Sequence, residues 1–344
     1  MKAAILSGIR AISLRELPKP RIRANEALVK VRAVGVCGSD LHFYLDGKIG
    51  DCVAGKGHIL GHEVSGEVAA VGSRVKGIKP GTRVAIEPGA ACGKCEYCRE
   101  GRYNLCKKMR FLGSPPVKGA YCEYIAWPAE YLFPIPDSMS FAQAAVVETL
   151  SVGMYAAGLA ELKPHETAAI LGCGPIGLVI LKALRTRSKS RVFVTDLLDT
   201  RLKASLKAGN VTAINRNSTD PVRKILELTR GRGVDVVFEA AGAEETCAQS
   251  VQLARPGGRV VWAGIPPGNT ISIDPHCARR KELVIKFVRR FRGNYPACVR
   301  AVGSGKINIS DLITHQFNLA DISSAFRLLD GYSDGVIKAV INIP

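Results

Sequence analysis

The first 150 residues contain short apolar runs that are separated by Gly and Pro. Three of these runs are EALVKVRAVGV (26–36), HEVSGEVAAVG (62–72) and GTRVAIEPG (81–89). Short runs rich in Val, Ile and Ala and bounded by Gly or Pro are typical of β-strands. The sequence therefore predicts an irregular, mostly β domain in this part of the chain.

The pattern changes after Ser151, and from Ala168 apolar runs alternate with segments of helical length. We expect strands at 168–172, 191–196, 211–215, 233–242 and 259–264. Between them we expect helices at Ile176–Arg187, 200–209, 220–231 and 244–258. This order of strand and helix predicts a parallel sheet covered on both faces. From about residue 285 to the end the pattern is mixed again.

A glycine-rich turn joins the first of these strands to the first helix. In AAILGCGPIG the residues Gly172, Gly174 and Gly177 form G-x-G-x-x-G, which favours a dinucleotide pyrophosphate at the helix N-terminus. Asp196 ends the second strand, where a carboxylate can accept hydrogen bonds from the adenosine ribose and repel a 2′-phosphate. These residues predict NAD rather than NADP, against the alternative of a structural turn followed by a surface Asp. Arg201 could stack on the adenine or be solvated.

The charge of the chain raises the question of an acidic partner. Lys and Arg number 48 against 30 Asp and Glu, a formal net charge of +18. However, the basic residues are spread along the chain, aromatic residues make up 6% of it, and no nucleic-acid motif is present. We therefore expect no nucleic-acid partner, and a basic surface that helps to attract an anionic cofactor.

No apolar run reaches the length that crosses a bilayer, and the start MKAAILSGIR is too short for a secretory signal. We expect a cytoplasmic protein without a membrane partner. In such a protein, clustered cysteines bind metal or do chemistry more often than they form disulfides.

Two groups of residues could hold a metal ion. Cys92, Cys95, Cys98 and Cys106 lie within fifteen positions at the spacing C-x2-C-x2-C-x7-C. The second group is scattered: Cys37, followed by Ser39 and His42, and the pair His62 and Glu63. One Cys, one His and one Glu can fill three tetrahedral positions on Zn²⁺ and leave the fourth for water or substrate.

These stretches resemble the zinc-dependent medium-chain dehydrogenases/reductases, and within that family the sorbitol (polyol) dehydrogenases. The resemblance runs nearly end to end through GVCGSDLHFYLDGKIGDCV, LGHEVSGEVAAVG, VVETLSVGMYAAG, LGCGPIGL, VTDLLDTRL and NYPACVRAV. It implies an α/β fold in which a GroES-like, mostly β catalytic domain (1–150 and 290–344) carries a structural zinc lobe at about 88–108. A Rossmann domain with a doubly wound parallel sheet would occupy 151–289.

The resemblance also implies roles for single residues. Cys37, His62 and Glu63 match the catalytic zinc ligands, and Cys92, Cys95, Cys98 and Cys106 match a structural zinc site whose four thiolates leave no open position. Ser39 and His42 match a proton relay; the alternative for His42 is a surface histidine. Glu148 matches an acid beside the metal. A fourth ligand from Glu148 would make the site net negative, so we expect Glu148 mainly to hold the metal-bound water or a substrate hydroxyl, and to bind the metal only when the fourth position is empty.

The glycine loop and the family pattern together assign the cofactor contacts to Gly172, Gly174, Pro175, Ile176, Gly177, Asp196, Arg201, Ala263, Gly264, Ile265, Val288 and Arg290. Substrate contacts fall at Phe43, Glu148, Arg290 and Phe291. At Phe43 and Phe291 the polyol dehydrogenases have tyrosine, so two hydroxyls are lost and the selectivity for sorbitol is in question. Arg289, Arg290 and Arg292 suit a phosphate or carboxylate; alternatively, Arg289 and Arg292 face water.

The expected function is NAD-dependent oxidation of a secondary alcohol in a polyol or sugar-alcohol derivative, with two zinc ions per subunit. The alternatives are a dehydrogenase of a phosphorylated or acidic polyol or of another secondary alcohol such as threonine, an NADP-dependent zinc-free reductase, and a non-catalytic NAD and zinc sensor. The zinc-free reductase would lack the metal ligands, and a sensor needs no open metal site. A homotetramer or homodimer is expected from the resemblance.

Overall fold

The computed structural model describes residues 1–344, which divide into two compact units. The first unit combines Met1–Glu148 with Arg292–Pro344, and the second is Thr149–Phe291. These boundaries lie two residues from the predicted ones. Helix α3 (Phe141–Ala160) begins in the first unit and ends in the second. No helix combines the length and the apolar character that crossing a membrane requires.

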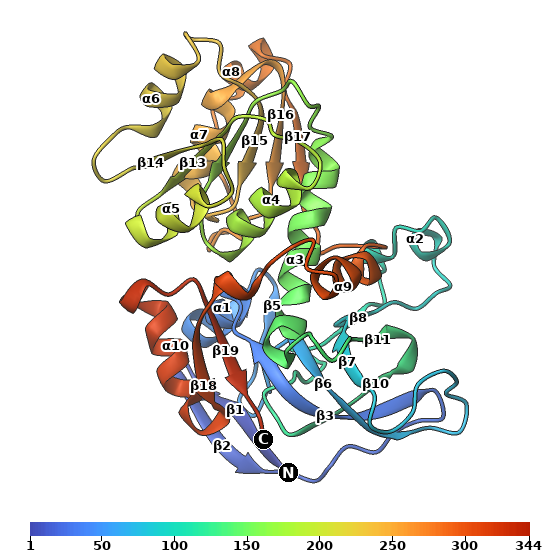
Figure 1. The fold of residues 1–344 in the computed structure, drawn as a ribbon. Coiled ribbons are helices and arrows are strands. Elements are labelled where there is room, and N and C mark those ends of the chain that lie inside the picture. The colour runs from blue at the N-terminus through green and yellow to red at the C-terminus, as the bar shows by residue number, and fades with distance from the viewer. The chain divides into compact units, whose positions relative to one another are not determined.

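A seven-stranded sheet forms the centre of the first unit (Figure 1). The strand order is β11 (Leu132–Pro134), β7 (Arg83–Ile86), β6 (Glu63–Val71), β3 (Glu26–Gly35), β19 (Lys338–Asn342) and β18 (Ile313–Asn318), with β10 (Tyr124–Pro128) also paired to β3. Three two-stranded sheets accompany it: β1 (Lys2–Gly8) with β2 (Ala11–Glu16), β4 (Lys48–Ile49) with β5 (Cys52–Val53), and β8 (Gly89–Ala90) with β9 (Arg110–Phe111). The prediction of a mostly β domain is confirmed.

Short helices complete this unit. The α-helices are α1 (Gly38–Asp46), α2 (Glu96–Arg99), α9 (Tyr295–Gly303) and α10 (Ile322–Asp330). The 3-10 helices are η1 (Tyr103–Leu105), η2 (Ala129–Tyr131), η3 (Ser310–Leu312), η4 (Leu319–Asp321) and η5 (Ser333–Gly335).

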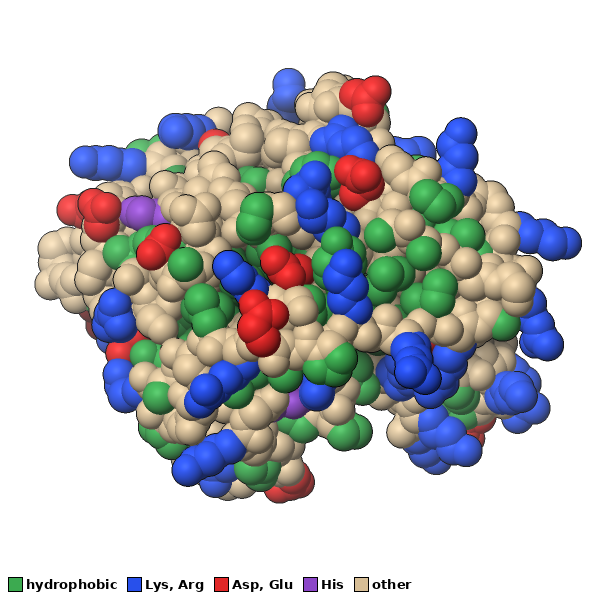
Figure 2. Space-filling view, turned by 90° about the horizontal axis from the view of Figure 1, so that it is seen from below, with side chains coloured by type: hydrophobic (Ala, Val, Ile, Leu, Met, Phe, Trp, Pro, Cys, Tyr) green, Lys and Arg blue, Asp and Glu red, His purple; other side chains and the backbone are tan.

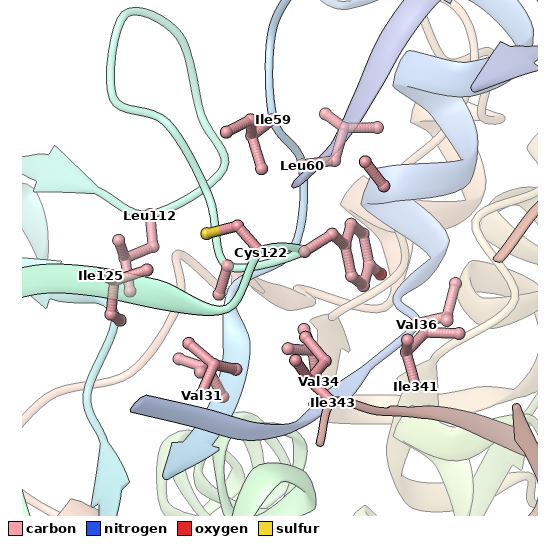
Figure 3. Packing of buried hydrophobic residues seen from close by; sticks show 14 of the residues in the cluster. Val31, Val34, Val36, Ile59, Leu60, Leu112, Cys122, Ile125, Ile341 and Ile343 are labelled. Atoms are coloured by element: carbon pink, nitrogen blue, oxygen red, sulfur yellow. The ribbon is translucent and has the colours of Figure 1, made fainter. Parts of the chain in front are cut away.

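The core of the first unit joins segments that are far apart in the sequence. Figure 3 shows Val34 of β3 beside Ile343, and Val36 beside Ile341 of β19, in a cluster that also contains Val31 and Cys122. All of these side chains are at most 5% exposed, so burial of their apolar surface holds the two ends of the chain in one sheet. The last residues of the chain therefore belong to the same layer as the segment that leads to Cys37.

The second unit is a six-stranded parallel sheet. Its order is β14 (Val211–Asn215), β13 (Val192–Asp196), β12 (Ala168–Leu171), β15 (Val234–Glu239), β16 (Ala254–Trp262) and β17 (Val284–Phe287). Every residue of the central strands β12, β13 and β15 is buried, as expected for strands covered on both faces. The helices are α4 (Pro175–Arg185), α5 (Asp199–Leu206), α6 (Pro221–Leu228), α7 (Glu244–Leu253) and α8 (Pro275–Arg280). This is the doubly wound order, and the predicted Rossmann architecture is confirmed.

One prediction about the end of this unit is wrong. The helix expected over 244–258 ends at Leu253, and the strand β16 begins at Ala254. Pro256 cannot continue a helix, and Gly257 has a φ of 68°, which a helix does not allow. The sixth parallel strand, β17, lies where the mixed sequence pattern begins and inside the predicted Rossmann domain. β17 lies at the edge of the sheet, where Val284 and Phe287 are exposed, and Lys286 interrupts its apolar run.

Basic side chains do not form one tract on the face shown in Figure 2. Lys and Arg are spread over it, with Asp and Glu among them. The basic residues are therefore scattered over this surface, as they are scattered along the sequence.

Candidate metal centres and cofactor loops

Antiparallel pairing of β3 and β6 brings Cys37, His62 and Glu63 together. Gly35 at the end of β3 pairs with Glu63 at the start of β6, and Cys37 follows β3 as the N-cap of α1. The ligand atoms of the three side chains all lie within 4.8 Å of one another. The sheet register thus converts two distant sequence motifs into one cluster.

The cluster fits a metal ion by its donor atoms and by an unpartnered oxygen. Glu63 is 1% exposed, and its Oε2 has no hydrogen-bond partner. A buried carboxylate oxygen without a partner is costly unless a cation completes it. Gly35 leaves room for this oxygen, because a Cβ at position 35 would overlap Glu63 Oε2. One thiolate, one imidazole and one carboxylate are a common donor set for zinc.

Asp40 orients the residues around this cluster, and the sequence reasoning did not assign it a role. Its Oδ2 accepts from the Cys37 amide (3.2 Å) and from the Tyr121 hydroxyl (3.0 Å). Its Oδ1 accepts from the Gly61 amide (3.1 Å) and lies 3.5 Å from His62 Nδ1. Burial would raise the pKa of Asp40, but His62 and the two amides lower it below its usual value. Asp40 is therefore a charged acceptor that fixes the His62 ring.

His62 is held in a strongly anionic setting. Burial alone would lower its pKa, but the neighbouring Asp40 and Cys37 raise the pKa well above its usual value. A proton and a metal ion therefore compete for the imidazole, so metal binding is coupled to proton release.

Glu148 lies in the electrostatic field of this cluster but is not one of its converging ligands. It belongs to α3 and is 4% exposed. Burial, opposed by His62 and reinforced by Glu63, raises the pKa of Glu148 to about 7. The carboxyl group can therefore exchange a proton near neutral pH.

Ser39 and His42 share one side of α1, because they are three residues apart on a helix. His42 Nδ1 lies 3.6 Å from Asp46 Oδ2, and the side chain is 25% exposed. Phe43, predicted to contact substrate, is 5% exposed and belongs to the apolar core of the first unit. Its contact with substrate stays a prediction.

The four clustered cysteines also converge. Cys92, Cys95, Cys98 and Cys106 have sulfur atoms within 4.8 Å of one another, a donor set that fits a closed tetrahedral zinc site. Two tyrosines connect this lobe to its surroundings. The Tyr103 hydroxyl donates to Glu87 Oε1 (2.8 Å) and accepts from the Gly293 amide (2.7 Å). The Tyr131 hydroxyl accepts from the Ala91 amide (3.0 Å).

The glycine loop of the second unit has the geometry that its sequence predicts. Gly172 has a φ of 95°, and a Cβ there would lie 2.8 Å from the Ala241 amide nitrogen. A Cβ on Gly177 would overlap the carbonyl oxygen of Gly172, so only glycine allows this approach of helix and strand. Gly174 is the N-cap of α4, with Pro175 and Ile176 as its first two helical residues. The loop follows β12, at the point where the strand order reverses.

Asp196 lies at the end of β13, and its side chain accepts a hydrogen bond from the glycine loop. Its Oδ2 accepts from the Cys173 amide (2.7 Å), and its Oδ1 accepts from the Leu198 amide (3.0 Å). Arg201 approaches it to 4.0 Å. Asp196 is thus fixed in place beside the glycine loop.

Glu239 organises the neighbouring loops, and no role was predicted for it. It ends β15, is fully buried, and its Oε1 accepts from the amides of Ala241 (2.8 Å) and Gly242 (2.7 Å) and from the Thr246 hydroxyl (2.8 Å). A Cβ on Gly264 would overlap Glu239 Oε2. The sequence feature that could have identified Glu239 is an acidic residue at the end of a buried strand. The other predicted cofactor and substrate contacts are Ala263 and Ile265, which flank Gly264, and Val288, Arg290 and Phe291, which follow β17.

Family models match most of the chain. The alcohol dehydrogenase GroES-like domain matches residues 23–137, and the zinc-binding dehydrogenase matches residues 175–303. The chain is 40% identical to sorbitol dehydrogenase of Bacillus subtilis (strain 168), over 99% of this chain and 97% of that protein. It is 34% identical to L-idonate 5-dehydrogenase of Vitis vinifera, over 99% and 94% of the two chains.

Solved structures give the same assignment. An oxidoreductase of unknown specificity from Escherichia coli, described as involved in membrane biogenesis, superposes with a TM-score of 0.93 at 34% identity, over 100% and 99% of the chains. A zinc-binding dehydrogenase from Sinorhizobium meliloti 1021, solved with NADP, superposes with a TM-score of 0.91 at 30% identity, over 99% and 98%. Zinc and a nicotinamide cofactor are implied by these matches. The chain therefore belongs to the zinc-dependent medium-chain dehydrogenase/reductase family, close to its polyol dehydrogenases, and is an oxidoreductase that acts on CH–OH groups.

Proposed function

We propose that this protein oxidises a secondary alcohol of a polyol with NAD. The convergence of Cys37, His62 and Glu63, with Glu63 Oε2 unpartnered, is the observation that carries the proposal. Three ligands leave a tetrahedral metal one position for substrate. The names of the two relatives, sorbitol dehydrogenase and L-idonate 5-dehydrogenase, support the polyol class.

Two zinc ions per chain are proposed. Cys37, His62 and Glu63 would hold the first, and Cys92, Cys95, Cys98 and Cys106 the second. When bound, the first zinc would lower the pKa of the substrate hydroxyl as a Lewis acid, and the nicotinamide ring would accept a hydride from the carbinol carbon. The second site has four thiolates and no open position, so its role would be structural.

The residues of α1 and α3 would handle the substrate hydroxyl and its proton. Glu148, which is buried on α3 close enough to His62 and Glu63 to feel their charges, would orient the hydroxyl by accepting a hydrogen bond. The Ser39 hydroxyl would take up the proton first, and the half-buried His42 imidazole would release it to water. If His42→Ala leaves the pH profile of turnover unchanged, the relay role of His42 is withdrawn.

Asp196 supports NAD as the cofactor. Its carboxylate is fixed by two backbone amides beside the glycine loop, and a 2′-phosphate there would meet a negative charge. The S. meliloti structure with NADP shows why both cofactors must be tested.

A substrate panel tests the proposal. Polyols, polyol phosphates, hydroxy acids and threonine would be assayed with NAD and with NADP, alongside metal analysis. The phosphates belong in the panel because Arg289, Arg290 and Arg292 suit phosphate. We expect polyol-dependent NAD reduction that Cys37→Ser abolishes and that Cys52→Ser, a change to a half-buried thiol beside Ser114, preserves. Turnover that survives Cys37→Ser would contradict the proposed zinc chemistry.

A further inference from the structure

Lys338 is a buried cation in an apolar strand. It lies in β19, is 2% exposed, and has Ala339, Val340 and Ile341 after it, all fully buried. Burying an ammonium group costs several kcal/mol unless it is paired and hydrogen-bonded. Lys338 Nζ donates to Glu63 Oε1 (2.6 Å) and to the carbonyl oxygen of Val36 (3.2 Å). Both partners adjoin or belong to the candidate catalytic metal centre.

The backbone fixes the lysine at this place. β19 runs antiparallel to β3 with Val340 opposite Gly35, and the Val36 amide donates to the Ala339 carbonyl (2.9 Å). The side chain therefore starts from the strand next to β3 and ends between Val36, which precedes Cys37, and Glu63. A single ammonium group thus holds the segments that carry two of the three candidate ligands.

The contact also selects one oxygen of Glu63. Lys338 occupies Oε1, and Oε2 is left without a partner. The empty space opposite Gly35 accommodates Oε2 and no side chain. If the carboxylate were free to turn, either oxygen could approach a metal ion; the ammonium group removes that freedom.

The charges around the candidate metal centre also favour a role for Lys338 there. A thiolate from Cys37 and the carboxylate of Glu63 would balance a divalent ion. The buried carboxylate of Asp40 would then be uncompensated without Lys338. Lys338 therefore keeps the donor set close to neutral, which preserves the pull of the metal on an alcohol oxygen.

We propose that Lys338 is a positioning residue of the catalytic metal site, which holds Glu63 by Oε1 so that Oε2 is presented to the metal. The proposal rests on the proposed function, since it takes Cys37, His62 and Glu63 as the ligands. A residue that orients a metal ligand typically changes metal affinity 10–100-fold when it is lost.

Cobalt(II) binding to the metal-depleted full-length protein tests the proposal without relying on activity. Cobalt in the four-cysteine site and cobalt in a site with one thiolate differ in their charge-transfer absorption, so the two sites titrate separately in one sample. We expect Lys338→Met to weaken cobalt binding at the one-thiolate site at least about tenfold and to leave the four-cysteine site unchanged. Lys338→Arg should recover most of the affinity. Lys306→Met, an exposed lysine of the same unit, is the matched control.

The outcomes separate the two levels of inference. If the unaltered protein shows only the four-thiolate absorption, the proposed catalytic site fails. If it shows both and Lys338→Met binds as tightly as the control, the role of Lys338 is refuted. Should Lys338→Met not fold, Glu63→Gln is compared with Glu63→Gln/Lys338→Met, in which neither charge is left alone. A lysine that acts through Glu63 adds less than about twofold there, whereas a separate structural contribution adds in full and overturns the proposal.

Discussion

Replacement of Asp40 by Asn should weaken metal binding at the Cys37, His62 and Glu63 cluster. The change keeps the volume but removes the charge, and it places an N–H donor on one side of the group. Oδ2 faces the donors of Cys37 and Tyr121, and Oδ1 faces Gly61 and His62. Whichever way the new amide group is turned, its N–H donor therefore faces other hydrogen-bond donors. Loss of one charge-assisted hydrogen bond costs about 1.5–3 kcal/mol, which is roughly a 10–100-fold loss of affinity.

The assay is competition for zinc with a chelator of known affinity, followed by zinc analysis per chain. Asp40→Asn should release one zinc at a 10–100-fold lower chelator strength, as expected for a partner of a metal-bound histidine, and keep the four-cysteine zinc. Asp51→Asn, an exposed acid on a turn of the same unit, is the control. A zinc affinity of Asp40→Asn within twofold of the control would refute the argument that Asp40 orients His62.

Three further changes test other parts of the structure. Burial raises the pKa of Glu87 from 4.5 to about 7. Between these pH values the folded protein keeps a proton that the unfolded chain releases. The contribution of Glu87 to the free energy of unfolding therefore falls as pH rises from about 4.5 to 7. Glu87→Gln should remove that fall, about 2.5 kcal/mol in urea unfolding at pH 8 relative to pH 5. The control is Glu67→Gln, at a partly exposed acid of β6, and parallel pH profiles for the two variants would contradict the prediction. Cys95→Ser should remove one zinc per chain and lower the thermal midpoint, and unchanged zinc content would exclude its ligand role. Asp196→Ala should raise the KM for NAD roughly tenfold and narrow the preference over NADP, since a charged hydrogen-bond acceptor is lost; an unchanged NAD to NADP ratio would show that selectivity lies elsewhere.

The strand and helix order of the second unit was predictable because its signals are local. β12 is an unbroken apolar run, β13 and β15 are mostly apolar, and Gly177 is required by a contact with Gly172 in the same turn. The edge strand β17 was not identified by the same signal, because it has only four residues and one of them is Lys286. The start of β16 was misplaced because Leu253 and Ala254 differ in backbone conformation, not in hydrophobicity.

The metal-binding sets could be proposed from sequence because cysteine and histidine are rare and their motifs are distinctive. Their supporting residues could not, because the interactions depend on pairing across the sheet. Asp40 lies within a quoted motif, yet only the fold brings it to His62. Lys338 is 275 residues from Glu63, and the only local sign was a lysine next to the apolar run Ala339–Ile341. Such a residue implies a buried partner without saying which one.

The position of β19 has a consequence for biosynthesis. The cluster of four cysteines spans fifteen residues, so its ligands leave the ribosome together and can bind zinc early. The other site has its three ligands by residue 63, but its proposed support, Lys338, arrives only when β19 joins β3, after the whole second unit has been made. At about 5–20 residues per second, the 275 residues between Glu63 and Lys338 take roughly 14 to 55 s to synthesise. During that interval the edge of β3 lacks its partner strand, so the two metal sites mature at different times on the same chain.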